Sequence, residues 1–365
     1  MRVSPDAPFQ NLPALPPRLD VETSAVLKCA IAANRSLARV DQASKLMPDP
    51  TVLINVIPLL ESQASSEIEN IVTTNDELFR AAHDVSTFVT PATREALRYR
   101  SALRGGFESI ENRPLSTNTA RLVCSTINDF DTDIRKQPGT YIGNPLTKER
   151  IYTPPEGQTV IIEHLACWED FLHENESTID PLIKMALLHY QFEAIHPFSD
   201  GNGRTGRILN MLYLVQADLL SLPITYLSGY IVRHKDTYYS LLNGVTQEEQ
   251  WEPWICFMLR AVESTSLWTL DLINSIVELQ DAALTRIQTR LNQPRARDLV
   301  DLLFHQPYVR SADVVNYCHV TRQTAARWLG ELADIEIVKR TEVGRSAVFV
   351  NTSFLARLFT TTLAD

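Results

Sequence analysis

The chain of 365 residues is 44% hydrophobic and 21% charged, a composition that can bury a sizeable core, and its length suggests two or three domains. It holds only 12 glycines, less than half of the usual share of about 7%, which excludes collagens, flexible linker proteins and many-turned β-sandwiches and favours helices. Acidic residues outnumber basic ones 44 to 34, so the formal net charge of −10 argues against a general nucleic-acid binder, while a local basic element stays open.

The sequence carries no signal for export or for membrane insertion. No run of about 18 apolar residues is present, and the N-terminal segment MRVSPDAPFQNLPALPP lacks the apolar core of a signal peptide. The five cysteines are scattered without a CxxC pair, and the histidines lack the spacing of a zinc site. We therefore expect a cytoplasmic protein without membrane contact, disulfides or zinc.

The first part of the chain is mostly helical by pattern. Residues 21–109 place apolar side chains at three- and four-residue spacing, and another helical stretch, TNTARLVCSTINDF, follows the turn at Pro114. Residues 139–157 change character, with short β-prone pieces around Gly143-Asn144-Pro145. This segment is predicted to form a β-hairpin, an exposed flap between helices.

Two strongly apolar helices follow the flap. Asp180 as N-cap and Pro181 at the first position begin the helix PLIKMALLHYQFEAI, whose apolar residues on most faces predict a central, buried element. The second helix runs from about Arg204 to Leu220. Further helices are expected in YYSLLNGV, in WEPWICFMLRAVES and in TLDLINSIVELQDAALTRIQTRL.

After a break at residues 292–294 the pattern changes again. Helix, short helix, turn, helix and a terminal β-hairpin with Gly344 at its tip follow the order of a winged helix. This last part is nearly neutral, whereas the rest of the chain is acidic. We predict an N-terminal helical region at 1–110, a core at 111–291 and a winged-helix domain at 292–365.

The loop between the two apolar helices, HPFSDGNGRTGR at residues 196–207, is built to hold an anion. Gly201, Asn202 and Gly203 leave backbone amides open at the start of the second helix, where the helix dipole favours negative charge. Arg204 and Arg207 lie three residues apart on the first turn, so both can point toward the same anion, and guanidinium groups suit phosphate oxygens. More than one phosphate can be held there.

The same loop supplies an acid–base group and a metal ligand. Asp200 offers a carboxylate suited to Mg²⁺, which usually binds through one or two carboxylates plus substrate phosphates. His196 can take a proton near neutral pH, and Phe198 is expected to point inward and fix the loop. Together these residues predict electrostatic stabilisation of a phosphorus centre, with a histidine base for an attacking hydroxyl.

HPFSDGNGRTGR resembles the HPFx(D/E)GNGRxxR motif of Fic-domain proteins and matches it at every defined position. The resemblance extends over most of the chain and is greatest to the longer bacterial Fic AMP-transferases. It implies a mainly α fold, a Fic-fold helical bundle with a β-hairpin flap and a C-terminal winged helix-turn-helix domain. It also implies transfer of AMP from ATP to a Ser, Thr or Tyr hydroxyl of a protein, with release of pyrophosphate. The intact Arg207 argues against the Doc-type kinases, whose motif lacks the second arginine.

The resemblance assigns roles by position. His196 would deprotonate the hydroxyl, and Asp200 would ligate the Mg²⁺ that accompanies ATP. The arginines would bind the β- and γ-phosphates within an ATP-binding segment that comprises Gly201, Asn202, Gly203, Arg204, Thr205, Gly206 and Arg207. Tyr230 and Tyr238, in SGYIVRHKDTYYSLL, are candidates for packing on adenine or ribose, and the alternative that both are core tyrosines stays open.

A second match lies upstream, at residues 65–70. SSEIEN fits the family's inhibitory motif (S/T)xxxE(G/N) with Ser65, Glu69 and Asn70, and Ser65 and Glu69 share one helical face. In the family such a glutamate pairs with the motif's second arginine, here Arg207, and prevents productive binding of the γ-phosphate. We therefore expect an autoinhibited enzyme.

The resemblance also points to macromolecular partners. In the family the flap pairs with the backbone of the target protein and presents its hydroxyl, as an added strand. Self-modification and a homodimer stay open. In the winged helix, basic and polar residues suited to a DNA backbone flank the expected recognition helix and wing: Arg322, Gln323, Thr324, Arg327, Lys339, Arg340 and Arg345. Nearby acidic residues make a protein partner or a scaffold role an equal alternative.

Two other functions compete with AMP transfer. The chain can be a transcriptional regulator in which the Fic-like region only senses a nucleotide. The same site can also remove AMP from a modified protein, with Glu69 orienting a water molecule.

Overall fold

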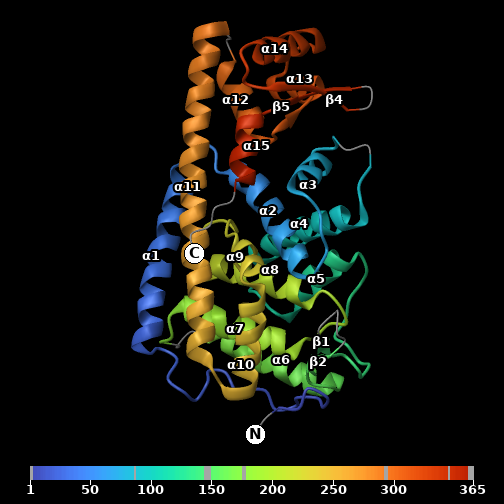
Figure 1. The fold of residues 1–365 in the computed structure, drawn as a ribbon, viewed down its shortest axis with the longest axis vertical. Coiled ribbons are helices and arrows are strands. Elements are labelled where there is room, and N and C mark those ends of the chain that lie inside the picture. Colours follow the sequence, from blue (N-terminus) through green and yellow to red (C-terminus); the bar gives the residue numbers. More distant parts are fainter. Residues whose placement is uncertain are drawn as a thin grey trace.

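The computed structural model describes residues 3–85, 88–143, 149–174, 178–291, 295–343 and 346–360. Within these residues the chain is mainly helical and its few strands are short, so the predicted fold class is confirmed at this level (Figure 1). None of the helices in the described part combines the length and the apolar character that crossing a bilayer requires.

The N-terminal part is a set of helices with well-defined ends. The side chains of Thr23, Thr74 and Thr90 cap three of them by accepting hydrogen bonds from backbone amides. α2 ends where Asn70 adopts a left-handed φ of 62°, a conformation that asparagine tolerates better than most residues. The helices are α1 (Ser24–Leu46), α2 (Thr51–Ile68), α3 (Asn75–Ala82) and α4 (Pro91–Ile110).

The predicted flap is a short antiparallel hairpin of β1 (Ile142–Gly143) and β2 (Arg150–Tyr152). Its turn, with Asn144 and Pro145, lies outside the described residues. The N-terminal arm packs beside the hairpin: the Phe9 amide donates to the Thr153 carbonyl at 3.0 Å, and the ring of Phe9 meets that of Tyr152 edge to face.

α7 is buried on nearly all faces, as expected. It lies among the helices of the lower part of the molecule (Figure 1). Asp180 caps it as predicted, by accepting hydrogen bonds from two backbone amides of the first turn. α8 ends at Gln216 rather than at Leu220, because Asp218 takes a left-handed φ of 55°. The helices of this part are α5 (Thr117–Asn128), α6 (Gln158–His173), α7 (Pro181–Ile195) and α8 (Asn202–Gln216).

One long helix connects the core to the C-terminal part. The two helices expected after Trp251 form a single element, α11 (Trp251–Leu291), because no glycine or proline interrupts the sequence after Pro253. α1 packs along α11, so the predicted N-terminal region and core share one interface (Figure 1). Between α8 and α11 lie α9 (Leu227–Arg233) and α10 (Lys235–Glu248).

The C-terminal part contains the predicted helices and hairpin in the predicted order. A further strand, β3, joins the hairpin in a three-stranded antiparallel sheet of order β3-β5-β4, and a last helix, α15, follows it. The winged-helix classification and a DNA or protein partner stay predictions, and Gly344 and Arg345 lie outside the described residues. The elements are α12 (Ala296–His305), β3 (Tyr308–Val309), α13 (Ser311–Cys318), α14 (Arg322–Asp334), β4 (Lys339–Val343), β5 (Ser346–Val350) and α15 (Thr352–Phe359).

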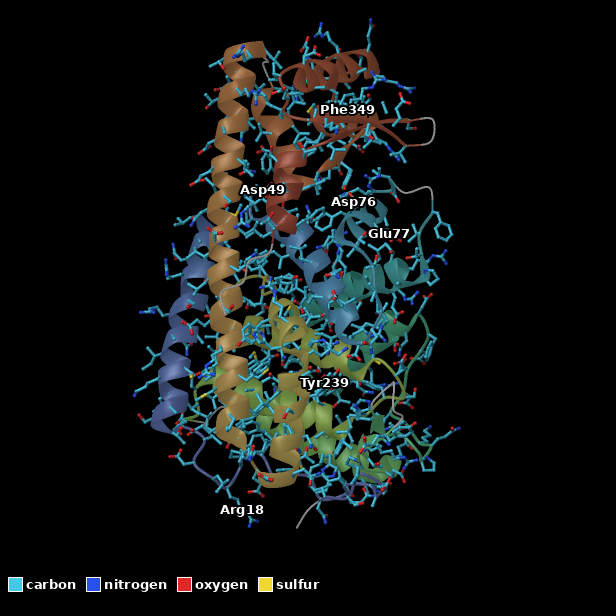
Figure 2. The ribbon with its side chains drawn as sticks, viewed as in Figure 1. Arg18, Asp49, Asp76, Glu77, Tyr239 and Phe349 are labelled. Carbon is cyan, nitrogen blue, oxygen red and sulfur yellow. The ribbon has the colours of Figure 1, made fainter. Side chains whose placement is uncertain are left out.

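This C-terminal part rests on the N-terminal helices. A ring nitrogen of His305 is hydrogen-bonded to Asp49 just before α2, and the Tyr308 hydroxyl donates to Asp76 of α3. Figure 2 labels both aspartates where the two parts face each other. The boundaries at 110 and 291 stay predictions, since packing contacts cross both.

Candidate active site

The loop after α7 has a shape fixed by its own side chains. His196 ends the helix with a left-handed φ of 49°. The Asn202 side chain then clasps Phe198, accepting from its amide and donating to its carbonyl, both at 2.8 Å. Phe198 is fully buried, as expected. The Asn202 side chain is therefore used to hold the shape of the loop.

The start of α8 presents backbone amides, as predicted. Gly201 has a left-handed φ of 82°, and a Cβ added there would lie 3.1 Å from the Asn128 side chain, so glycine is required. The amide of Asn128 and the thiol of Cys124 both donate to the Asp200 carbonyl at 3.2 Å and hold the turn against α5. The first amides of a helix have no partner within it, and they favour an anion.

Arg207 is buried and paired with the residues of the predicted inhibitory motif. Its Nε donates to the Ser65 hydroxyl at 2.8 Å, and Nη2 donates to the Ser65 carbonyl at 3.0 Å and to Glu69 Oε1 at 2.8 Å. Arg207 is 1% exposed and Glu69 is 33% exposed. The structure thus brings together two segments that lie 138 residues apart.

The Glu69 carboxylate lies on the turn expected to hold phosphate. A Cβ added to Gly203 would be 2.4 Å from Glu69 Oε1, so only glycine allows this approach. Burial alone would raise the pKa of Glu69, but the Arg207 guanidinium outweighs it and holds that pKa below its ordinary value. Asn70 secures the end of the segment, since its Oδ1 accepts a hydrogen bond from Lys235 at 2.9 Å. An ionised carboxylate therefore lies at the turn that is predicted to bind an anion.

Arg204 does not join Arg207 on that carboxylate. It is 3% exposed, is hydrogen-bonded to Glu95 of α4, and has Asp200 Oδ2 at 3.8 Å. Glu95 was not predicted, and no local signal marks it, because it lies 109 residues from Arg204. Asp200 itself is 75% exposed beside the turn, and its role as a metal ligand stays a prediction. Among the described residues no group of three or more His, Cys, Asp or Glu side chains surrounds a metal position.

His196 is held neutral. Burial and then the charge of Arg135 lower its pKa to about 4, against smaller effects of Glu69, the Glu193 carbonyl and Asp200 that raise it. Its Nδ1 has no hydrogen-bond partner in the part of the chain that the structure describes. Arg135, which the sequence did not single out, donates from Nε to the His196 carbonyl at 2.8 Å. A neutral imidazole is able to accept a proton.

An open cavity lies beside the C-terminal end of α7, between the hairpin, α7 and α10. Figure 2 labels Tyr239, which lines it from α10. Tyr230 and Tyr238 do not line it: Tyr230 stacks on His234, and the Tyr238 hydroxyl is 2.8 Å from His189 Nε2 in the core. Their role in packing on adenine or ribose stays a prediction. The cavity is lined by Ile142, Ile151, Tyr152, Tyr190, Glu193, Ala194, Tyr239, Leu242, Asn243 and Thr246.

Comparisons with known families agree with this arrangement. The family described as "Fic/DOC family N-terminal" matches residues 27–108, and "Fic/DOC family" matches residues 119–214, which include the whole loop. A third, "Protein adenylyltransferase SoFic-like, C-terminal domain", matches residues 279–354. Together they cover more than half of the chain. The chain belongs to the Fic/DOC family.

Relatives of this Fic protein share limited parts of it. A probable protein adenylyltransferase of Aquifex aeolicus is 40% identical over 82 residues, which are 22% of this chain and 24% of the relative. Protein adenylyltransferase Fic of Aedes aegypti is 26% identical over 200 residues, 49% of this chain and 38% of the relative. The match thus spans well under two thirds of either relative.

Solved structures extend the likeness to the whole fold. A Fic family protein from Desulfovibrio desulfuricans G20 superposes with a TM-score of 0.58 at 17% identity, covering 93% of this chain and 98% of its own. Fic-1 from C. elegans gives a TM-score of 0.54 at 20% identity, over 68% of this chain and 74% of its own. The helical Fic fold is therefore confirmed.

Proposed function

We propose that this Fic protein transfers AMP from ATP to a Ser, Thr or Tyr hydroxyl of a target protein and releases pyrophosphate. The observation that carries the proposal is the anion-binding turn of α8, with Gly203 and Arg207, next to the neutral His196 at the end of α7. The names of the relatives, protein adenylyltransferases, point in the same direction.

His196 is the proton acceptor in this mechanism. The target hydroxyl gives its proton to the imidazole while its oxygen attacks the α-phosphorus of ATP, and the bond from that phosphorus to the β-phosphate bridging oxygen breaks. The amides of residues 201–203, together with Arg204 and Arg207, stabilise the charge on the departing pyrophosphate. The clasp of Asn202 on Phe198 keeps acceptor and turn in register.

The exposed carboxylate of Asp200 fits a role as Mg²⁺ ligand, because it stands beside the turn and carries charge. When bound there with ATP, Mg²⁺ would supply neutralisation of phosphate charge. With one carboxylate from the protein, phosphate oxygens and water would supply the other ligands, as is usual for Mg²⁺ with a nucleotide.

The pairing of Glu69 with Arg207 is proposed to keep the enzyme inactive. The carboxylate takes both the guanidinium and the space over Gly203 that the terminal phosphate of ATP needs. Two negatively charged groups cannot share that position without a large electrostatic cost. Productive ATP binding therefore requires Glu69 to move away.

The remaining parts of the substrates have places beside the loop. The aromatic and aliphatic side chains of the cavity, including Tyr239 and Tyr152, suit a nucleobase. The hairpin edge suits the extended backbone of a target protein, which would add to it as a strand.

The test is the intact mass of the Glu69→Gly protein after incubation with ATP and Mg²⁺, alone and with candidate target proteins. We expect the Glu69→Gly protein or its target to gain the mass of one AMP. The double variant Glu69→Gly, His196→Ala should show no such gain, although it should still bind ATP. Nucleotide binding without any covalent gain would support a nucleotide-sensing regulator instead. Release of AMP from a modified target without added ATP would indicate the reverse reaction.

A further inference from the structure

One carboxyl group in the cavity has no role in the mechanism above. Glu193 lies on α7 one turn before His196 and lines the cavity toward α10. Its Oε1 is buried and has no hydrogen-bond partner within the described residues. Burial raises its pKa to about 7, with Arg207 acting in the opposite direction. A buried polar group without a partner is costly, and such groups often await a ligand.

Glu193 lies between the first turns of α8 and the apolar side chains of the cavity. Its Oε1 packs against α8, where a Cβ added to Gly206 would lie 2.6 Å away. On its other side, Tyr239, Leu242 and Asn243 of α10 line the same cavity. Among the described lining residues, Glu193 alone carries a carboxyl group.

The parts of a nucleotide differ in chemistry in the same order as these surroundings of Glu193. The phosphates belong at the start of α8, and the base belongs among the aromatic and aliphatic side chains. The part that joins them is the sugar, whose hydroxyls are neutral hydrogen-bond donors. A carboxyl group repels phosphate and accepts hydrogen bonds from hydroxyls, and acidic side chains bind ribose hydroxyls in other nucleotide folds.

From these positions we infer that Glu193 binds the ribose hydroxyls of the nucleotide and makes the site selective for ribonucleotides over deoxyribonucleotides. The inference rests on the proposed function, since it takes ATP as the ligand of this site. It adds a specificity-determining residue that contacts neither the phosphates nor the base.

The experiment measures dissociation constants for ATP, 2′-deoxy-ATP and 3′-deoxy-ATP by calorimetry, with all proteins in the Glu69→Gly background so that Glu69 does not compete. The parent protein should bind at least one deoxy analogue about fivefold or more weakly than ATP, the effect of losing one hydrogen bond to the carboxyl group. Glu193→Ala should bind all three nucleotides within about twofold of one another. Glu193→Gln, which keeps the side-chain volume, should retain only part of the discrimination.

Asn243→Ala is the matched control, because it truncates another polar side chain of the same cavity. It should weaken the binding of all three nucleotides alike and leave the ratio of the dissociation constants for the deoxy analogues and ATP unchanged. Equal binding of ATP and both deoxy analogues by the parent would overturn the inference and leave the proposed function intact. The inference would also be overturned if the parent, Glu193→Ala and Glu193→Gln all gave the same ratio of dissociation constants for the deoxy analogues and ATP. Failure of the parent to bind ATP at all would instead refute the proposed function.

Discussion

Replacing Glu69 by glycine should turn the enzyme on. The substitution removes the carboxylate 2.8 Å from Arg207 Nη2 and opens the space over Gly203. A hydrogen bond between charged groups contributes about 1.5–3 kcal/mol, so loss of this competitor should raise the affinity for ATP roughly tenfold to a hundredfold. The rate of AMP transfer at subsaturating ATP should rise by a similar factor.

The same substitution should make stability depend on the nucleotide. Arg207 is 1% exposed, and removing the partner of a buried charge costs about 3 kcal/mol. The Tm of Glu69→Gly should therefore fall without ligand and recover with ATP, which contributes about 2.7 kcal/mol at one hundred times its dissociation constant. Thermal unfolding with and without ATP, together with transfer of the labelled α-phosphate of ATP to protein, measures both effects.

Glu67→Gly is the matched control for this experiment. Glu67 lies on the same helix and is exposed, and its carboxylate accepts a hydrogen bond from Gln63 rather than from Arg207. Glu67→Gly incurs a helix-propensity cost of about 1 kcal/mol, more than glycine costs at position 69, which caps the end of α2. Equal AMP transfer by the wild type, Glu67→Gly and Glu69→Gly would refute the reasoning, as would an ATP-induced gain in Tm no larger in Glu69→Gly than in the wild type.

Further predictions concern the loop and the buried acids. The pKa of His196 is lowered to about 4, so the neutral base should persist as pH falls. The rate of AMP transfer by Glu69→Gly at saturating ATP should therefore not decrease as pH falls through about 6.5, the ordinary pKa of histidine. A drop to half of the maximal rate near pH 6.5 contradicts this. Asn202→Ala leaves the amide and carbonyl of buried Phe198 without partners and should lower the free energy of unfolding by about 2 kcal/mol in urea titrations; a loss below about 0.5 kcal/mol would show that the clasp is dispensable. Burial raises the pKa of Glu61 to about 7, so its ionisation destabilises the fold increasingly as pH rises from 4.5 to 7. Glu61→Gln should therefore raise Tm more at pH 8 than at pH 5. An equal change in Tm at both pH values argues against a neutral Glu61.

Local sequence signals were sufficient for the central helices and the loop. Asp180 followed by Pro181 marks the start of α7, since capping and the fixed φ of proline act within one turn. The turn at Gly201 needs a left-handed φ, which the glycine itself indicates. Both features depend on neighbours in the chain, and the sequence displays those neighbours.

Features that depend on distant segments were not visible in this way. Glu95 reaches Arg204 from α4, and Arg135 reaches the His196 carbonyl from the loop after α5, with nothing in either local pattern to mark them. Which tyrosine of α10 lines the cavity depends on the rotation of α10 against the rest of the fold, including α11, on which it packs. Glu69 was found because a family motif records a tertiary contact that periodicity alone does not contain.

The central claim, transfer of AMP, is tested most directly by following the two ends of ATP at once. The Glu69→Gly protein and candidate targets are incubated with Mg²⁺ and with ATP labelled either on the α-phosphate or on the γ-phosphate. We predict that protein retains the α-label, that the γ-label leaves as pyrophosphate, and that His196→Ala abolishes both. Retention of the γ-label on protein would show phosphoryl transfer instead, and it would contradict the account.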